Sequence, residues 1–148
     1  MTDFTLHYWP IPFRGHFPRA ALAHAAADWT EAGTEATAEA IEAPVSVQAV
    51  PHMAPPLLID HRRDVAVAQM PAIMAHLGAV LDLMPGDPAR DALALKAVLD
   101  ANDVLDEITR DGGRQMWDAA SWREFQPRLA RWMAIFEETG RRHALTAE

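Results

Sequence analysis

Few side chains in this 148-residue sequence are of a type that takes part in catalysis, and the residues around them limit which reactions they could support. Tyr8 is the sole tyrosine, and Arg14 follows it after a short proline-rich stretch. A phenol hydroxyl donates a hydrogen bond, and the planar fork of an arginine suits carboxylates. The sequence contains no cysteine, which excludes disulfides, a protein thiolate and cysteine-ligated metals. Any thiol chemistry must therefore use a thiol that a ligand brings.

The spacing of the serines and histidines does not indicate serine hydrolysis or metal binding. The two serines, Ser46 and Ser121, lack the Gly-x-Ser-x-Gly context of serine hydrolases. The histidines form no His-Glu-x-x-His motif and no pair at metal-ligand spacing, so we expect no metal site. We interpret the seven as scattered surface or hydrogen-bonded residues: His7, His16, His24, His52, His61, His76 and His143. His16, directly after Arg14-Gly15, is the one histidine that we would test as a substrate-site residue.

Charge and hydropathy restrict the partners. With 21 acidic against 13 basic residues the formal net charge is −8, the wrong sign for a surface that binds phosphates. We therefore expect no nucleic-acid partner. No apolar run is long enough and sufficiently uncharged to cross a bilayer, and the N-terminus has no basic-then-apolar leader. These features predict a cytoplasmic protein without a membrane segment.

Proline and glycine divide the first 80 residues into a small α/β unit. Residues 29–37 are ambiguous, and we interpret them as a weak strand followed by an irregular or short helical stretch. Two apolar runs on either side of a four-residue polar turn favour an antiparallel hairpin. The other predicted elements are a strand over 4–8, a helix over 17–27, hairpin strands over 56–60 and 65–68, and a helix over 71–78.

Beyond residue 86 the pattern is helical only. Asp87-Pro88 predicts a cap and a first turn, and Gly112-Gly113 predicts the end of that helix. Ser121-Trp122-Arg123-Glu124 has the spacing of a capping box for a second helix. Pro127 conflicts with a helix that starts at Ser121, because an interior proline costs about 3 kcal/mol. The second helix therefore either begins near Pro127 or is kinked there.

Four short segments, in this order, resemble the tyrosine-type cytosolic glutathione transferases, and the chain looks like a bacterial member of that family. The resemblance covers residues 4–140 and rests on Tyr8-Trp9-Pro10 with Arg14-Gly15, Pro56-Leu57-Leu58-Ile59-Asp60, Gln69-Met70-Pro71-Ala72-Ile73, and Asn102-Asp103. It implies an α/β, thioredoxin-like, glutathione-binding domain over 1–80 and an all-α domain over 87–148. The helical domain is shorter than the family's, so the chain is either a fragment or naturally cut down.

The resemblance implies that glutathione is a co-substrate and Tyr8 the catalytic residue. A hydroxyl that donates a hydrogen bond to the glutathione sulfur favours the thiolate and lowers the pKa of the thiol. The thiolate then attacks a small electrophile to give a thioether, with thiol-dependent peroxide reduction as the next reaction to consider. Arg14 holds the loop or pairs with a ligand carboxylate, and Gln69 binds the γ-glutamyl end. Asp103 reaches the site of the partner in a homodimer, and the implied role is detoxification.

Each of these residues also has a purely structural interpretation. Tyr8 is then a strand aromatic whose hydroxyl meets a backbone carbonyl, and Arg14 is a surface arginine. Gln69 is then a polar residue at the end of a strand. Asp103 lies on a helix rich in acidic residues, where a solvated carboxylate is the ordinary finding.

Two positions depart from the family pattern. The family's cis-proline follows a residue that pairs its backbone N–H and C=O with glutathione, but Pro55 stands before Pro56 and has no N–H. If Pro55 were itself the cis residue, Ala54 would restore that donor and the motif would slip by one position. Met70 replaces a serine or threonine and offers only a weak sulfur acceptor, although the helix start still presents free N–H groups. The alternative is a non-catalytic binding or assembly protein with an impaired glutathione site.

Overall fold

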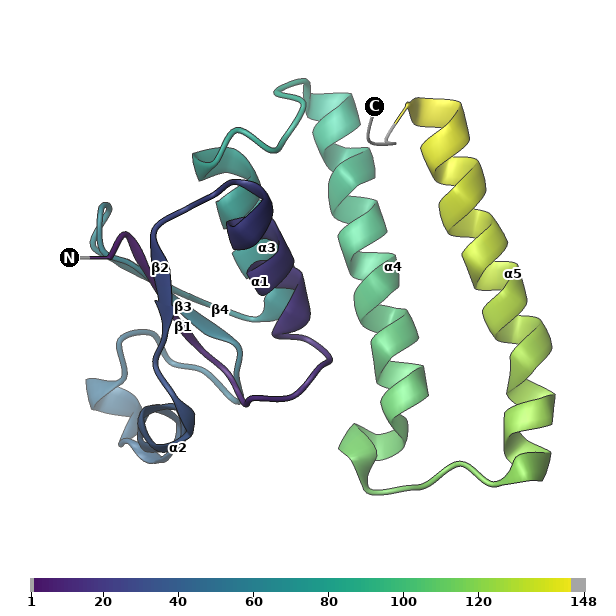
Figure 1. The fold of residues 1–148 in the computed structure, drawn as a ribbon, viewed down its shortest axis with the longest axis horizontal. Coiled ribbons are helices and arrows are strands. Elements are labelled where there is room, and N and C mark those ends of the chain that lie inside the picture. Colours follow the sequence, from purple (N-terminus) through teal and green to yellow (C-terminus); the bar gives the residue numbers. More distant parts are fainter. Residues whose placement is uncertain (1, 145–148) are drawn as a thin grey trace. The chain divides into compact units, whose positions relative to one another are not determined.

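The computed structural model describes residues 2–144, and the chain divides into two compact units between Met84 and Pro85. Residue 1 and residues 145–148, the outer ends of the two predicted domains, lie outside the described residues. The first unit is α/β and the second contains helices, which is the predicted fold class (Figure 1). Within the described residues, no helix is long and apolar enough to cross a membrane.

A four-stranded sheet with the strand order β2-β1-β3-β4 forms the centre of the first unit. β1 pairs parallel with β2 and antiparallel with β3, and β3 and β4 form the predicted hairpin. The segment that the sequence left ambiguous holds a three-residue strand and then a regular helix. The elements are β1 (Phe4–His7), α1 (His16–His24), β2 (Trp29–Glu31), α2 (Thr34–Glu42), the 3-10 turn η1 (Val45–Val47), β3 (Leu57–Asp60), β4 (Val65–Ala68) and α3 (Met70–Val80).

Helices cover both faces of this sheet. Burial alternates along β1, and Phe4 and Leu6 are buried together with Tyr8, the next residue of that parity. These side chains pack with Leu22 of α1 and with residues of α3 in one apolar core. α2 lies on the opposite face, where Figure 1 shows it apart from α1 and α3. The alternation of apolar residues in β1 is therefore what directs Tyr8 toward α1.

The second unit contains two long helices, α4 (Pro88–Gly113) and α5 (Ala119–His143). Asp87 caps α4 as predicted, since its carboxylate accepts hydrogen bonds from the backbone N–H groups of Ala89 and Arg90 at 3.1 and 3.0 Å. Helical backbone angles are lost from Arg110 to Gly112, so the regular helix is interrupted two residues before the Gly112-Gly113 pair that was predicted to end it. α4 and α5 are the two long helices that the periodicity indicated.

The predicted start of α5 is wrong. Asp118 is the N-cap, and its capping-box partner is Ser121, the third residue of the helix. The prediction instead made Ser121 the cap and Glu124 its partner. The Asp118 carboxylate accepts from the N–H groups of Ala120 and Ser121 at 2.9 and 2.8 Å, and the Asp118 N–H donates back to the Ser121 hydroxyl at 3.3 Å. Aspartate and serine are both good N-caps, so spacing alone could not choose between them. Pro127 lies inside the helix, where its missing N–H leaves one helical hydrogen bond unmade.

An aromatic cluster forms the core between α4 and α5. The indole of Trp117 packs 4.8 Å from the ring of Phe125, and its N–H donates to the Ile108 carbonyl at 2.9 Å. Trp132 meets Phe125 edge-on at 5.8 Å, and the guanidinium of Arg110 lies 4.6 Å from the Trp117 ring. Trp117 therefore connects the aromatic side chains of α5 to α4, through its hydrogen bond to Ile108 and its contact with Arg110.

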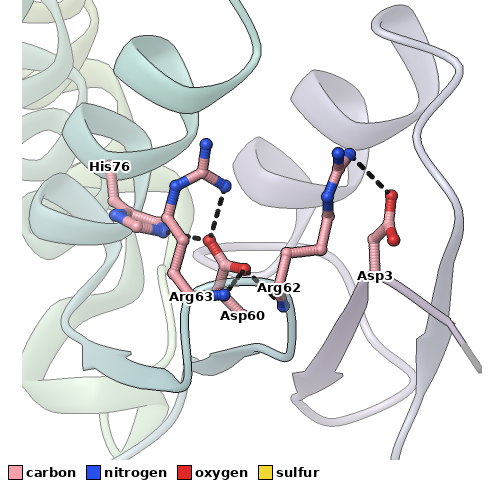
Figure 2. Close-up of polar contacts among 5 residues, drawn as sticks. All are labelled: Asp3, Asp60, Arg62, Arg63 and His76. Carbon is pink, nitrogen blue, oxygen red and sulfur yellow. Dashed lines mark hydrogen bonds and ion pairs between the residues drawn. The ribbon is translucent and has the colours of Figure 1, made fainter.

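A buried carboxylate ties the β3–β4 hairpin to α3. Asp60 is fully buried, and its Oδ1 accepts from the backbone N–H groups of Arg62 and Arg63 at 3.0 and 3.1 Å. Its Oδ2 accepts from the Arg63 guanidinium at 3.2 Å and lies 2.9 Å from Nε2 of His76 (Figure 2). Burial alone would raise the pKa of Asp60, but the hydrogen bonds from His76 and Arg63 outweigh it and hold that pKa below its ordinary value.

We expect Asp60→Asn to lower the free energy of unfolding by about 2–4 kcal/mol. The amide NH₂ of asparagine cannot accept hydrogen bonds, so some of the donors from Arg62, Arg63 and His76 would lose their acceptor. Asp3→Asn is the matched control. The Asp3 carboxylate forms a surface ion pair with Arg62 at 3.3 Å (Figure 2), so neutralising it should cost less than about 1 kcal/mol. Urea denaturation measures both variants, and equal losses would contradict the role assigned to Asp60.

The lowered pKa of Asp60 also predicts how stability depends on pH. The folded carboxyl holds its proton less tightly than the unfolded one, so its stabilisation is complete above the ordinary value of 3.8 and is lost as pH falls through the folded pKa. The stability difference between the natural protein and Asp60→Asn should therefore stay constant from neutral pH down to about pH 4 and shrink as the pH falls further. Urea midpoints of both proteins across this range test it, and a gap that widens on acidification would show the opposite sign.

Candidate functional site

The strand register gathers three of the predicted site positions at one end of the sheet. His7 of β1 lies opposite Leu57 of β3, and Leu57 lies opposite Ala68 of β4. One residue beyond each of these paired positions come Tyr8, Pro56 and Gln69, all at the same end. Segments that are about fifty and sixty residues apart in the sequence thus end side by side, because β3 runs antiparallel to both neighbours.

Tyr8 and the Arg14-Gly15 pair are also brought together. The Tyr8 side chain is buried, and a Cβ built on Gly15 would lie only 2.1 Å from Cδ1 of the ring. Gly15 has ordinary helical backbone angles, so it is required here because the ring occupies the space of a side chain. Arg14 itself is half-buried beside this contact. Gly15 therefore leaves room for the tyrosine ring at the start of α1.

The peptide bond between Pro55 and Pro56 is cis, so Pro55 is the residue that precedes the cis-proline. The alternative register, in which Ala54 takes that place, is not adopted, and Ala54 is exposed. Pro56 is buried at the start of β3, and Pro55 is half-buried. Pro55 has no N–H, so the backbone at this position offers a ligand only its carbonyl oxygen.

Gln69 and Met70 form the junction between β4 and α3, and they differ sharply in exposure. Gln69 is exposed and has a φ of 73°, a left-handed conformation that is uncommon for a residue with a side chain. Such strain collects at functional positions. Met70 is fully buried in the core, so its thioether is a packing group, and only its backbone N–H faces the start of the helix. Pro71 has no N–H, and the next free donor in this turn belongs to Ala72.

Asp103 belongs to the second unit, outside the group that the sheet register gathers. It is exposed on α4 and borders a hollow of about 380 Å³ between α4 and α5. Its apolar lining consists of Val104 of α4 and Trp132, Ile135 and Phe136 of α5. Its charged lining includes two ion pairs, Lys96 with Asp100 and Arg128 with Glu107. Within residues 2–144, no cluster of three or more metal-ligating side chains is found.

Two side chains next to Tyr8 were not singled out from the sequence. His7 has a lowered pKa because it is buried, and its Nδ1 is enclosed without a hydrogen-bond partner. Arg19 of α1 pairs with Glu31 of β2 at 2.6 Å and lies 5.4 Å from the centre of the Tyr8 ring. A lone arginine in an alanine-rich helix is most simply interpreted as a solvated residue, and nothing in the spacing shows what lies across from it.

The chain has been compared with known families and structures. Residues 93–148 match the family model described as "Glutathione S-transferase, C-terminal domain". No curated protein matches the sequence.

Solved structures that share the fold are glutathione transferases or their relatives. A glutathione transferase homologue from Sulfitobacter with bound glutathione superposes with a TM-score of 0.58 at 20% identity, over 95% of this chain and 69% of that one. Ure2p in complex with glutathione gives 0.70 at 18% identity, over 97% and 71%. A C. elegans glutathione transferase gives 0.64 at 19% identity, over 91% and 66%. At these identities the likeness shows the fold, and it extends over nearly the whole of this chain.

The contact between Gly15 and Tyr8 predicts that Gly15→Ala lowers the free energy of unfolding by about 1–3 kcal/mol, because the methyl group overlaps the ring. Gly78→Ala is the matched control. Its Cβ would lie 2.7 Å from Cγ of Met84, a flexible side chain that can move, and alanine favours the helix by about 1 kcal/mol. Urea denaturation of both variants should show a loss for Gly15→Ala alone, and similar values for the two would contradict the assigned contact.

Proposed function

From a chain that has the glutathione transferase fold and whose residues 93–148 match that family's C-terminal domain, we infer a glutathione transferase. Residues 1–80 are proposed as the glutathione-binding domain and residues 87–148 as the helical domain. Glutathione is the co-substrate, as the bound ligand of two of the similar structures suggests. The single observation that carries the proposal is the position of Tyr8, at the sheet end that also holds the cis Pro55–Pro56 bond and the start of α3.

In the proposed reaction the Tyr8 hydroxyl donates a hydrogen bond to the glutathione sulfur. This hydrogen bond stabilises the thiolate relative to the thiol, so the thiol loses its proton near neutral pH. A sulfur lone pair then forms a bond to an electrophilic carbon, and the displaced group leaves with the bonding electrons. Tyr8 stays protonated and forms no covalent bond. The chain has no cysteine, which agrees with a sulfur supplied by the ligand.

The polar ends of glutathione find fewer partners here than in a complete family motif. Gln69 is proposed to hold the γ-glutamyl end, together with the N–H groups of Met70 and Ala72 at the start of α3. Arg14 is proposed to pair with a carboxylate or to hold the loop. Pro55 contributes a carbonyl acceptor without a donor. The proposed affinity is therefore modest.

Further aspects of the function follow the family. A small electrophile is the proposed second substrate, and detoxification the proposed role. The protein is proposed to act in the cytoplasm as a homodimer, with Asp103 reaching the partner's glutathione site. Asp103 is exposed on α4, which agrees with such a contact. A monomer in light scattering would remove Asp103 from the site.

The decisive test is a glutathione titration of the natural protein and Tyr8→Phe by calorimetry, with ultraviolet detection of the bound thiolate. We expect the substitution to raise the pKa of the bound thiol by about one to two units, with only a small change in affinity. Thr5→Val is the matched control, since it removes a hydroxyl from the same strand that lies 2.8 Å from Nε2 of His61.

A thiolate signal that Tyr8→Phe abolishes and Thr5→Val retains supports the enzyme. Glutathione that binds without a thiolate signal would take Tyr8 out of its catalytic role. No binding at millimolar glutathione would overturn the proposal and favour the non-catalytic binding or assembly protein.

A further inference from the structure

Arg19 connects three separate parts of the first unit. Its Nη2 and Nη1 donate to the carbonyl oxygens of Trp9 and Ile11 at 2.9 and 3.0 Å. Its Nε and Nη2 donate to the two carboxylate oxygens of Glu31 at 2.6 and 3.2 Å. One guanidinium of α1 therefore joins the loop that follows β1 to the end of β2.

This loop begins directly after Tyr8, and at its far end the Phe13 carbonyl accepts a hydrogen bond from the His16 N–H at 2.9 Å. Pro10 and Pro12 supply no N–H for backbone hydrogen bonds. Ile11 and Phe13 are exposed, and Phe13 has a left-handed φ of 78°. A loop with this composition needs hydrogen bonds from outside to fix its carbonyl groups. Arg19 supplies two of them, immediately after the tyrosine.

The same guanidinium lies against the tyrosine ring. Its carbon is 5.4 Å from the ring centre of Tyr8, and the arginine side chain is only 18% exposed. The Tyr8 ring thus contacts both Gly15 and Arg19. The charge of Arg19 is secure, because its hydrogen bonds with Glu31 raise the pKa of the guanidinium further.

We propose that Arg19 is a positioning residue, whose bonds to Trp9, Ile11 and Glu31 fix the place of the Tyr8 hydroxyl. The role of that hydroxyl rests on the proposed function, whereas the positioning of the ring does not. The fork of arginine is essential, because a lysine ammonium cannot reach two carbonyls and a carboxylate in a plane at once. Arg19→Lys keeps the positive charge, and we expect that it will not preserve the position of the Tyr8 ring.

Tyr8 is the sole tyrosine, so labelling with fluorotyrosine gives one fluorine NMR resonance that reports this ring without any ligand. We expect Arg19→Gln and Arg19→Lys to shift and broaden the resonance toward its position in urea. Arg62→Gln is the matched control, because it removes an arginine–carboxylate pair on the surface, at 3.3 Å from Asp3. It should leave the resonance unchanged.

The second measurement is the pKa of the bound glutathione thiol in the same variants. We expect Arg19→Gln to raise it by about one unit, which is about 10-fold less thiolate near neutral pH. In a Tyr8→Phe background Arg19→Gln should add nothing, because Arg19 acts through the hydroxyl. A merely structural residue would lower stability without this dependence on Tyr8.

The outcomes separate the two proposals. If Tyr8→Phe leaves the bound thiol unchanged, or glutathione does not bind, the proposed function fails, and the fluorine resonance still decides whether Arg19 positions the ring. If Tyr8→Phe acts as expected but Arg19→Gln matches Arg62→Gln in both measurements, the positioning role is overturned. Should Arg19→Gln fail to fold, Glu31→Gln loosens the same fork from its far side, and an unchanged resonance in that variant overturns the proposal.

Discussion

The buried Asp60 carboxylate is the interaction on which the arrangement of the first unit depends. It fixes the turn of the β3–β4 hairpin through two backbone N–H groups, and it fixes α3 through His76. α3 begins at Met70, at the opposite end of the same hairpin. Because the helix is anchored near His76, its first turn has a defined place beside Gln69 and Pro56. A carboxylate far from the candidate site thus determines where the start of α3 lies, and the free N–H groups of a helix start can receive a ligand anion.

The two ends of the sheet are built differently. At the Asp60 end a fully buried charge is satisfied by four donors. At the Tyr8 end the loop contains two prolines and a left-handed Phe13, and a partly exposed arginine binds the carbonyls of Trp9 and Ile11. The candidate chemistry therefore lies at the end of the sheet where a loop follows the strand. This division agrees with the general placement of function on loops that a rigid scaffold positions.

The sequence predicted the fold well because proline, glycine and polar turns mark the ends of its elements. The hairpin, the proline-led α3 and the Asp87 cap all follow from local pattern. Asp118 was missed because two good capping residues stand three positions apart, and Pro127 made a later start attractive. Arg19 was missed for another reason: its partners Trp9, Ile11 and Glu31 come from three different segments, and no local pattern encodes their meeting. The burial of Met70 is likewise a property of how α3 packs on the sheet.

The departures at Pro55 and Met70 would weaken the proposed glutathione site without removing its basis. A backbone hydrogen bond lost to proline is worth about 0.5–1.5 kcal/mol, which is about 2-fold to 13-fold in affinity. Met70 is buried, so the hydroxyl missing there is replaced by core packing, which leaves the two N–H groups of Met70 and Ala72 in place. In the proposed reaction, the stabilisation of the thiolate depends on a different contact, the hydroxyl of Tyr8. The proposal thus assigns affinity and thiol activation to different residues, and a chain that lost part of the first can keep the second.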